Sequence, residues 1–307
     1  MTMQELIECK NISKTYGKKL ALKNVSFSLP LRGVFALIGR NGAGKTTLIK
    51  ILSTLLEPTS GTAEIGKINI VKNPAEIRKS IAVLSQEAKA VNWLTPRQQI
   101  FIYLLYRGMG INEAKMKTEE VIKTFKIGKN ADIVNSRLSG GIKRKVLIAM
   151  VISTGSKILF LDEPTIGLDP IAREELWYIL RRLKKTHFIF LTTHYLNEAE
   201  ALADNIGIFD EGRLVQIGTL QELRKNINYQ YSIYVQESRI SLKSLKRYGK
   251  VVKGIDNKLQ LLVDQKNADL LSKKFIQQKI RFSINPISLE DIFYYFTKKQ
   301  ILEESYE

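Results

Sequence analysis

The chain has a single cysteine, Cys9, among its 307 residues, and it has no long apolar run. One cysteine cannot form an intramolecular disulfide, and the absence of a cysteine pair is typical of a reducing compartment. The most apolar stretch, residues 100–106, lies between Arg97 and Arg107 and falls short of the roughly 18 residues that a membrane-spanning helix needs. The first ten residues do not have the shape of a signal peptide. These absences argue against a disulfide-stapled fold and against a membrane span.

Acidic residues are the minority, with 30 Asp and Glu against 48 Lys and Arg and a net charge of +18. Such an excess can indicate a nucleic-acid partner, or an anionic membrane surface where each basic side chain contributes about 1 kcal/mol. The basic residues are spread along the chain and interleaved with acidic ones, which favours an ordinary solvated surface, with membrane proximity as the second interpretation. The length suits one large domain plus a smaller one, and there is no internal repeat or low-complexity segment.

Residues 39–46 read GRNGAGKT, which is the G-x-x-x-x-G-K-T pattern of a phosphate-binding loop. The apolar run 33–38 predicts a strand before the loop, and residues 47–52 predict a helix after it. Small residues let backbone N–H groups turn towards a phosphate, and the helix N-terminus adds about half a positive charge. Lys45 supplies a charge for the β- and γ-phosphates of a nucleotide, and the Thr46 hydroxyl can ligate Mg²⁺.

A second apolar run, residues 157–161, is followed by two carboxylates, Asp162 and Glu163. A run without polar alternation predicts a strand that is buried on both faces of a parallel sheet. Ligands of open α/β sheets bind at the carboxyl ends of the strands, so we expect both carboxylates beside the phosphates. There Asp162 can hold Mg²⁺ through water, and Glu163 can polarise an attacking water. The alternative, a solvated loop start, is disfavoured by the phosphate loop.

Three further polar positions lie at the ends of predicted elements. Residues 139–141 precede apolar residues at helical spacing and predict a second helix N-terminus that can meet an anion; an ordinary N-cap is the alternative. Gln86 follows the strand-like run 80–84, and His194 ends the run 188–193. A lone histidine at a strand end is more often structural than functional, but its order and spacing after the carboxylate pair favour a functional role.

In this order the motifs resemble the nucleotide-binding subunit of an ATP-binding cassette (ABC) transporter, over residues from about 4 to 225. The resemblance implies a P-loop NTPase (RecA-like) α/β core that binds ATP and Mg²⁺. Among the implied nucleotide-binding residues, Tyr16 stacks on adenine, and Asp169 of the D-loop communicates across a dimer. The others are Gly39, Asn41, Gly42, Gly44, Lys45, Thr46 and Thr47 of the phosphate loop, and Ser139, Gly140 and Gly141 of the LSGG signature.

The same resemblance implies three catalytic residues and three positions for the metal. Glu163 is implied as the general base, and His194 as the residue that holds the γ-phosphate and the attacking water. Gln86 is implied as the link from the γ-phosphate and the metal to a membrane partner. The implied positions for Mg²⁺ are Thr46, Gln86 and Asp162.

Finer features are similar to the daunorubicin-type exporter ATPases. These are the basic residues after the signature, the run THYLNEAE at 193–200 and the run SLEDIF at 288–293. Members of that branch pair with separate permeases that move drugs, peptides, lipids or polysaccharides. Two residues depart from the common pattern: Ile142 replaces the usual Gln at the fifth signature position, and Arg40 stands where a small residue or Pro is commoner. Neither departure removes a catalytic group, so we expect a competent site.

The pattern predicts a nucleotide-binding domain over residues 1–227, with a helical subdomain at about 87–155 where the family inserts one. That subdomain usually forms the docking groove for a permease, and we expect the apolar residues at 100–106 to be core rather than groove. Residues 222–228 are polar and predict a linker.

Residues 228–307 predict a small α+β domain of the ferredoxin-like type. The expected order is strand, helix (242–248), strand, strand, helix and strand, followed by a final helix at 289–298. Nothing in this region has catalytic spacing, and we expect the aromatic cluster at 293–296 to serve packing.

One chain carries both a phosphate loop and a signature helix, and in the family these complete different nucleotides. The resemblance therefore implies an ATP-dependent homodimer that works with a separate integral membrane permease at the cytoplasmic face of the membrane. We expect no specific nucleic-acid partner. If the protein drives transport, another chain forms the path across the bilayer.

Two other classes remain as alternatives. One is a soluble ABC-type ATPase that acts on ribosomes or nucleic acid through its basic surface. The single uninterrupted cassette argues against it, because translation-factor relatives usually carry two cassettes and DNA-maintenance relatives split theirs with a coiled coil. A bare regulatory nucleotide switch is weaker, because Glu163 and His194 are both present.

Overall fold

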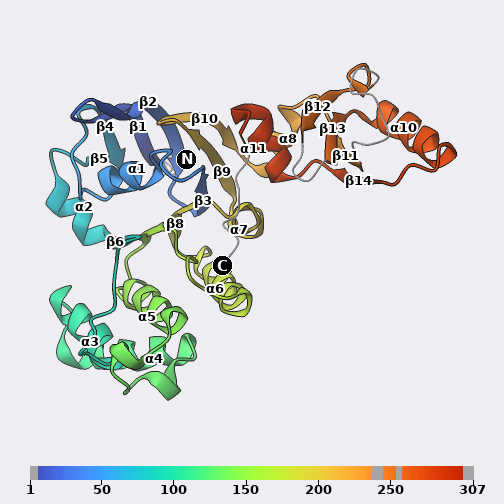
Figure 1. Ribbon diagram of the computed structural model, residues 1–307. Helices are drawn as coiled ribbons and strands as arrows, with labels where there is room; N and C mark the ends of the chain where they lie inside the picture. The colour runs from blue at the N-terminus through green and yellow to red at the C-terminus, as the bar shows by residue number, and fades with distance from the viewer. Residues whose placement is uncertain (1–5, 237–244, 254–257, 300–307) are drawn as a thin grey trace. The chain divides into compact units, whose positions relative to one another are not determined.

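The computed structural model describes residues 6–236, 245–253 and 258–299, and the chain divides into two compact units (Figure 1). The first unit is Met1–Val215 and the second is Gln216–Glu307, so the division falls inside a strand, β10 (Arg213–Gly218). The domain boundary near residue 227 stays a prediction.

The remaining elements of the first unit follow in chain order. They are β1 (Leu6–Tyr16), β2 (Lys19–Pro30), β3 (Gly33–Ile38), α1 (Lys45–Leu52), β4 (Ser60–Ile65), β5 (Ile68–Asn69), α2 (Pro74–Ser80), β6 (Ile81–Leu84), α3 (Pro96–Tyr106), α4 (Ile111–Thr124), α5 (Gly140–Ile152), β7 (Ile158–Asp162), α6 (Pro170–Leu183), β8 (Phe188–Thr193), α7 (Leu196–Leu202) and β9 (Asn205–Asp210).

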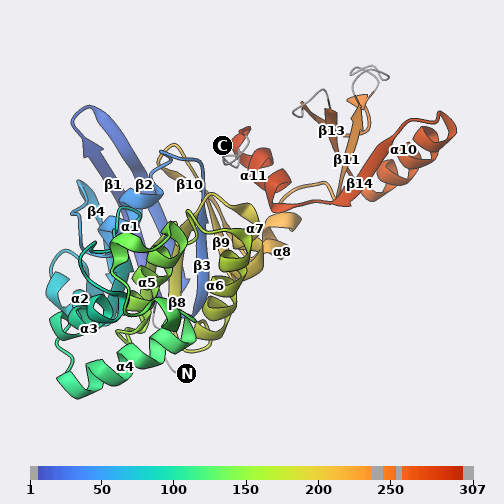
Figure 2. The same cartoon turned by 60° about the horizontal axis from the view of Figure 1, so that its bottom comes forward.

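The core of this unit is a six-stranded sheet in the order β10-β9-β3-β8-β7-β6. The pairs β3–β9, β3–β8, β8–β7 and β7–β6 are all parallel, and Figure 2 shows β9, β3 and β8 side by side. Every residue of β7 and β8 is buried, as expected for strands covered on both faces. Because parallel strands end at one edge, the segments after β3, β6, β7 and β8 all emerge there. The predicted P-loop α/β core is confirmed.

A second sheet is antiparallel, in the order β2-β1-β4-β5. Its long hairpin β1–β2 turns at Gly17, whose φ of +55° lies in the left-handed region that favours glycine. Tyr16, the residue predicted to stack on adenine, is the last residue of β1 and pairs with Lys19. The hairpin therefore places this aromatic ring at the tip of the sheet.

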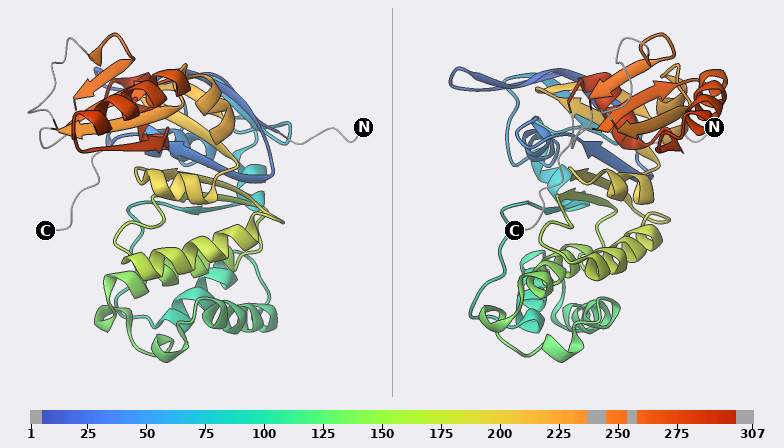
Figure 3. Two further views of the ribbon diagram at one scale, coloured as in Figure 1. Left: turned by 90° about the vertical axis from the view of Figure 1, so that its right-hand side faces the viewer. Right: turned by 45° about the vertical axis from the view of Figure 1, so that its right-hand side comes forward.

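Helices α3, α4 and α5 form a block of their own, drawn in green in Figure 3, in the region where a helical subdomain is predicted. Helix α3 begins with a capping box: Thr95 accepts a hydrogen bond from the Gln98 N–H at 3.2 Å, and the Gln98 side chain accepts one from the Thr95 N–H at 3.0 Å. Ile100 and Leu104 are fully buried, as expected of core, whereas Tyr106 is 89% exposed. No helix in the described part of the chain is long and apolar enough to span a membrane.

The second unit contains a four-stranded sheet with helices on its faces. Its elements are α8 (Leu220–Lys225), β11 (Tyr231–Gln236), β12 (Lys250–Lys253), β13 (Lys258–Val263), α10 (Gln265–Gln277), β14 (Phe282–Pro286) and α11 (Leu289–Thr297). The sheet is antiparallel in the order β12-β13-β11-β14, which is compatible with a ferredoxin-like unit. Residues 242–244 of the helix expected at 242–248 lie outside the described residues, and residues 245–248 form a helical end and a turn, so the ferredoxin-like assignment stays a prediction.

The faces of this sheet differ in chemistry. One face forms an apolar core with α10, in which Ile233, Leu261, Leu271 and Phe275 are at most 2% exposed. The other face carries a buried polar contact, in which the Gln260 side chain donates to the Asp291 carboxylate of α11. The predicted α+β character of the C-terminal region is therefore confirmed.

We expect Thr95→Ala to lower the free energy of unfolding of the first unit by about 0.5–2 kcal/mol, because the first turn of α3 loses its cap. Urea denaturation followed by tryptophan fluorescence measures this change, since Trp93 and Trp177 both lie in that unit. Thr95→Ser keeps the oxygen and is the control. Equal losses in both variants would contradict the role of the cap.

Candidate functional site

The phosphate loop links β3 to α1 and is shaped by its glycines. Gly44 is the N-cap of α1 with φ of +110°, and no side chain caps this helix, so its first N–H groups are left to an external acceptor. A Cβ at Gly44 would lie 2.8 Å from the carbonyl oxygen of Ala21, and one at Gly39 would lie 2.4 Å from that of Phe209. Both positions therefore require glycine, because a side chain would displace the neighbouring backbone.

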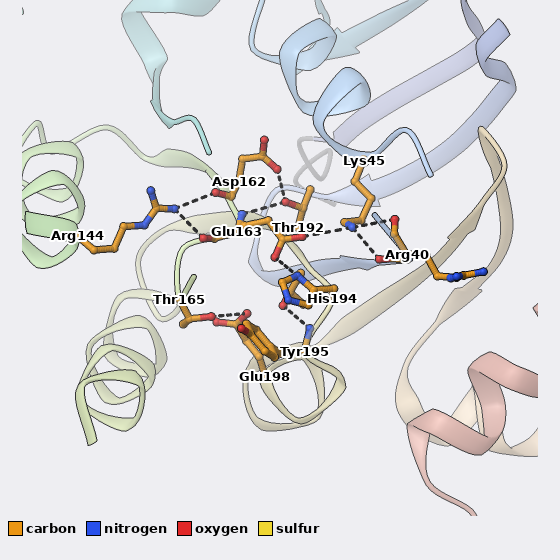
Figure 4. A network of polar contacts seen from close by, with 12 residues as sticks. Arg40, Lys45, Arg144, Asp162, Glu163, Thr165, Thr192, His194, Tyr195 and Glu198 are labelled. Atoms are coloured by element: carbon orange, nitrogen blue, oxygen red, sulfur yellow. Dashed lines mark hydrogen bonds and ion pairs between the residues drawn. The ribbon is translucent and has the colours of Figure 1, made fainter. Parts of the chain in front are cut away.

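Lys45, the first residue of α1, is buried, and its ammonium group is surrounded by oxygen atoms. Its Nζ donates to the carbonyl oxygens of Gly39 at 2.7 Å and Arg40 at 3.3 Å. The same Nζ lies 3.3 Å from Oε1 of Glu163 (Figure 4). Three protein oxygens thus hold the charge where a phosphate oxygen is expected.

Glu163 follows β7 with a φ of +51° and is only 3% exposed. Its N–H donates to the carbonyl oxygen of Thr192 at 3.2 Å, so the backbone conformation is fixed by β8. While Oε1 faces Lys45, Oε2 lies 2.7 Å from Nδ1 of His194. Burial alone would raise the pKa of Glu163, but the hydrogen bond with His194 and the charge of Lys45 outweigh burial and lower it. This carboxylate is ionised at neutral pH.

Asp162, the last residue of β7, is fully buried, and only one of its two carboxylate oxygens has a hydrogen-bond partner. Its Oδ1 accepts a hydrogen bond from the Thr192 hydroxyl, whereas its Oδ2 has no hydrogen-bond partner. Burial raises the pKa of Asp162, and hydrogen bonds from the Thr192 and Thr46 hydroxyls act in the opposite direction. A buried carboxylate oxygen without a partner is costly, so this atom is a candidate ligand for a cation.

The donor set around Asp162 fits Mg²⁺. The free Oδ2 and the hydroxyl of Thr46 are hard oxygen donors, which is the chemistry that Mg²⁺ prefers. No group of three or more His, Cys, Asp or Glu side chains could hold a metal within residues 6–236, 245–253 and 258–299. Few protein ligands suit Mg²⁺, which usually keeps several waters and binds the phosphates of its substrate.

The other predicted residues lie outside this buried contact network. Gln86 is exposed in a turn after β6, and Tyr16 is 46% exposed, with the Lys14 ammonium 5.6 Å from the centre of its ring. Ser139 caps α5, and its Oγ accepts from the Ile142 N–H at 3.4 Å. In the described part of the chain, no hydrogen bond or ion pair joins these residues to Lys45 or Glu163.

The remaining predicted positions flank these elements. Asp169 caps α6 and accepts from the Ala172 N–H at 2.9 Å. Asn41, Gly42 and Thr47 belong to the phosphate loop and the first turn of α1, and Gly42 has a φ of +78°. Gly140 and Gly141 are the first two residues of α5, where Gly140 is exposed. The exposed Ser139 and Gly140 leave the start of α5 accessible to a ligand or another chain.

Arg144, one of the basic residues after the signature, is a buried residue of the site that the sequence pattern did not single out. Its guanidinium group donates to the backbone carbonyls of Pro164 at 3.0 Å, Asp162 at 3.1 Å and Glu163 at 2.7 Å (Figure 4). Burial lowers the pKa of Arg144, and the neighbouring carboxylates act against that shift. The sequence does contain a sign that Arg144 is buried. It lies three, four and seven residues before the buried positions 147, 148 and 151 of α5, so it shares their face of the helix.

Glu198 forms a second network that the sequence did not reveal. This carboxyl group of α7 is fully buried and accepts hydrogen bonds from Thr165 and from the Trp177 indole, each at 3.2 Å. Burial raises its pKa to about 7, although hydrogen bonds from Thr193, Trp177 and Thr165 favour the charged form. The network joins α6 and α7 to the segment that follows Glu163, and no local pattern indicates which side chains meet there.

A parallel sheet with a phosphate loop after β3 and a carboxylate pair at the end of β7 defines a P-loop nucleotide-binding protein. The ABC transporter family profile matches residues 22–166. The chain is 34% identical over 219 residues to the linearmycin resistance ATP-binding protein LnrL of Bacillus subtilis, which covers 71% of this chain and 70% of that protein. It is 36% identical over 222 residues to the daunorubicin/doxorubicin resistance ATP-binding protein DrrA of Streptomyces peucetius, covering 72% of this chain and 67% of the relative.

Solved structures agree with these relatives. The dimeric structure of a bacterial ABC transporter cassette superposes with a TM-score of 0.65 at 25% identity, over 70% of this chain and 98% of that one. The chain belongs to the ABC transporter family and carries its ATP-binding cassette. The prediction of an ATP-binding, ATP-hydrolysing protein of this family is confirmed. Some relatives are much longer: the match to ABC transporter A family member 6 of Arabidopsis thaliana spans 26% of that protein.

We expect Lys45→Ala to weaken ATP binding by about 10- to 100-fold, because the nucleotide loses a charge-assisted contact with its phosphates. Calorimetric titration with ATP and Mg²⁺ measures the affinity. Lys50→Ala is the control, because Lys50 lies on the same helix but forms only a surface ion pair with Glu87 at 3.4 Å. Equal affinities in the two variants would remove Lys45 from phosphate binding.

Proposed function

We propose that this chain is the ATP-hydrolysing subunit of an ABC exporter and that it drives a separate membrane permease. The observation that carries the proposal is the position of Glu163, which lies between Lys45 and His194 at the carboxyl edge of the sheet. Hydrolysis needs three groups, and this site has all of them. The Lys45 ammonium can bind a phosphate, the Glu163 carboxylate can accept a proton from water, and the His194 imidazole can orient the phosphate and the carboxylate. The names of LnrL and DrrA, which describe resistance ATP-binding proteins, support the export direction.

Binding of ATP changes the partners of Lys45. The N–H groups of the loop and of the uncapped start of α1 face the β-phosphate, and Lys45 exchanges its contact with Glu163 for phosphate oxygens. Glu163 then loses the cation that lowers its pKa, so its basicity rises when substrate is in place. In the free protein, Lys45 therefore compensates the buried charge of Glu163. When ATP binds and takes Lys45 as its partner, Glu163 becomes a stronger base.

Hydrolysis proceeds by attack of water on the γ-phosphorus. Glu163 accepts a proton from the water while the new P–O bond forms, and the bond from the γ-phosphorus to the bridging oxygen breaks to give ADP and phosphate. Nδ1 of His194 stays on Glu163 at 2.7 Å, which leaves Nε2 for the γ-phosphate. Tyr16 stacks on the adenine ring.

Thr46, Asp162 and Gln86 would hold Mg²⁺ at this edge of the sheet. Asp162 is suited to this role because its Oδ2 is buried without a hydrogen-bond partner. Mg²⁺ supplies charge neutralisation of the phosphate oxygens when it is bound. Arg144 keeps the peptide carbonyls of the carboxylate pair in place, so that both side chains retain their directions.

The site is completed by a second copy of the chain. Ser139 and Gly140 are exposed at the start of α5, and within the described residues no polar contact links them to the phosphate loop of the same chain. A head-to-tail dimer would bring this helix N-terminus to the γ-phosphate held by the other copy, and Asp169 would communicate across the dimer. The similarity to a cassette that is dimeric in its solved structure supports this arrangement.

The permease docks on the helical block that follows Gln86. This block and the turn before it expose large apolar side chains, with Trp93 of the turn 79% exposed and Ile102 and Tyr106 of α3 49% and 89% exposed. The block connects through Gln86 to the edge of the sheet that binds the phosphates, so nucleotide state and permease contact are linked along the chain. The protein would then lie at the cytoplasmic face of the membrane.

We expect Glu163→Gln to retain ATP affinity and to lower the turnover number by about 10²–10⁴-fold, the usual contribution of a general base. Steady-state ATP hydrolysis and equilibrium nucleotide binding measure the two quantities separately. Glu76→Gln, on the exposed face of α2, removes the same charge away from the site and should match the wild type. Near-normal turnover of Glu163→Gln would exclude Glu163 as the base.

A tagged Glu163→Gln protein should retain its closed assembly longest, because hydrolysis no longer separates the two copies. Affinity purification from solubilised membranes of its own cells with ATP, followed by mass spectrometry, should recover a polytopic membrane protein. Recovery should fall for the same protein carrying Tyr106→Ser. Ribosomal proteins or nucleic acid without a membrane protein would support the soluble-ATPase class instead.

A further inference from the structure

The second unit holds two lysine ammonium groups over one tyrosine ring. Nζ of Lys250 lies 4.0 Å from the centre of the Tyr295 ring, and Nζ of Lys298 lies 5.2 Å from the same centre. Lys250 is the first residue of β12, and Lys298 is the C-cap of α11. We call these three residues the Tyr295 cluster.

The packed elements of the unit fix the position of this cluster. Lys298 ends α11 with a φ of +60°, and its Nζ donates to the carbonyl oxygen of Tyr295 at 3.0 Å. Helix α11 is held to the sheet by the hydrogen bond from Gln260 of β13 to Asp291. Strand β13 in turn pairs with β12, where Lys250 stands opposite Leu262. The ammonium groups of Lys250 and Lys298 are therefore held beside the same ring by β12 and α11.

The cluster has no counter-ion in the described part of the chain, where no carboxylate lies within 4.0 Å of either ammonium group. Burial, and then the ammonium of Lys298, lower the pKa of Lys250 to about 8. The ring face of Tyr295 attracts both cations, but it carries no net charge and does not neutralise them. Like charges held together cost free energy, and an anion bound between them would recover it.

We propose that the Tyr295 cluster binds a phosphate group through its two ammonium groups, which the aromatic ring holds together. A phosphate monoester or inorganic phosphate carries between one and two negative charges near pH 7, which matches two cations better than a single carboxylate does. Lysines bind phosphate as point charges and need no bidentate geometry. The group can be carried by an anionic lipid or by a small soluble molecule, and the chemistry at the cluster is the same for both.

The proposal is tested by calorimetric titration of the full chain with inorganic phosphate. A non-hydrolysable ATP analogue with Mg²⁺ is present in excess, so that the phosphate loop is occupied. We expect binding to the wild type and at least about tenfold weaker binding to the double variant Lys250→Met/Lys298→Met, which loses two charge-assisted contacts. The double variant Lys250→Arg/Lys298→Arg keeps both charges and should bind. The control Lys266→Met/Lys273→Met removes the same net charge from exposed positions of α10 and should bind as the wild type does.

Sedimentation with vesicles distinguishes the two sources of the phosphate group. Phosphatidylcholine vesicles with and without phosphatidic acid are compared for the cluster variant and the α10 control. The site is assigned to a lipid headgroup if the cluster variant sediments less than the α10 control with vesicles that contain phosphatidic acid, and equally with vesicles that lack it. Equal sedimentation of both variants, together with a loss in the titration, assigns it to a soluble phosphate. If neither measurement separates the cluster variant from the control, the proposal is wrong.

Discussion

The site depends on a buried carboxylate that must be compensated wherever the chain places it. Glu163 is nearly inaccessible to water, and an isolated charge there would be strongly unfavourable. It is stabilised by Lys45 from the start of α1 and by His194 from the end of β8. These three side chains come from three segments that follow neighbouring parallel strands. The order β3-β8-β7 of the sheet is therefore a requirement of the chemistry as well as of the fold.

A second layer of contacts holds that arrangement in place. Thr192 of β8 bonds to the side chain of Asp162 and to the backbone of Glu163, and Arg144 binds the carbonyl oxygens of both residues. Arg144 belongs to α5, the helix that Ser139 caps. Helix α5 and the edge of the sheet that carries the carboxylate pair are thus joined by direct hydrogen bonds.

The second unit has its own apolar core on one face of its sheet and a polar contact to α11 on the other. Its charges are arranged differently from those of the cassette. In the cassette the buried carboxylate of Glu163 lies beside the Lys45 ammonium, whereas the Tyr295 cluster brings two cations together with a neutral ring. The first arrangement stabilises the free protein, and the second favours an external anion.

The sequence by itself determined the identity of the cassette and its main elements, whereas the linker predicted at residues 222–228 is wrong, because helix α8 spans Leu220–Lys225 and buries Leu223. The phosphate loop is contiguous, so its eight residues predict their own backbone conformation, and the unbroken apolar runs predict buried parallel strands. The tertiary structure decided which side chains meet. No local window shows that Lys45 faces Glu163, that Arg144 points at a strand end, or that Lys250 and Lys298 share one ring. The physical reason is that short-range patterns set the backbone of each element, while the order of strands in the sheets sets the distances between residues far apart in the chain.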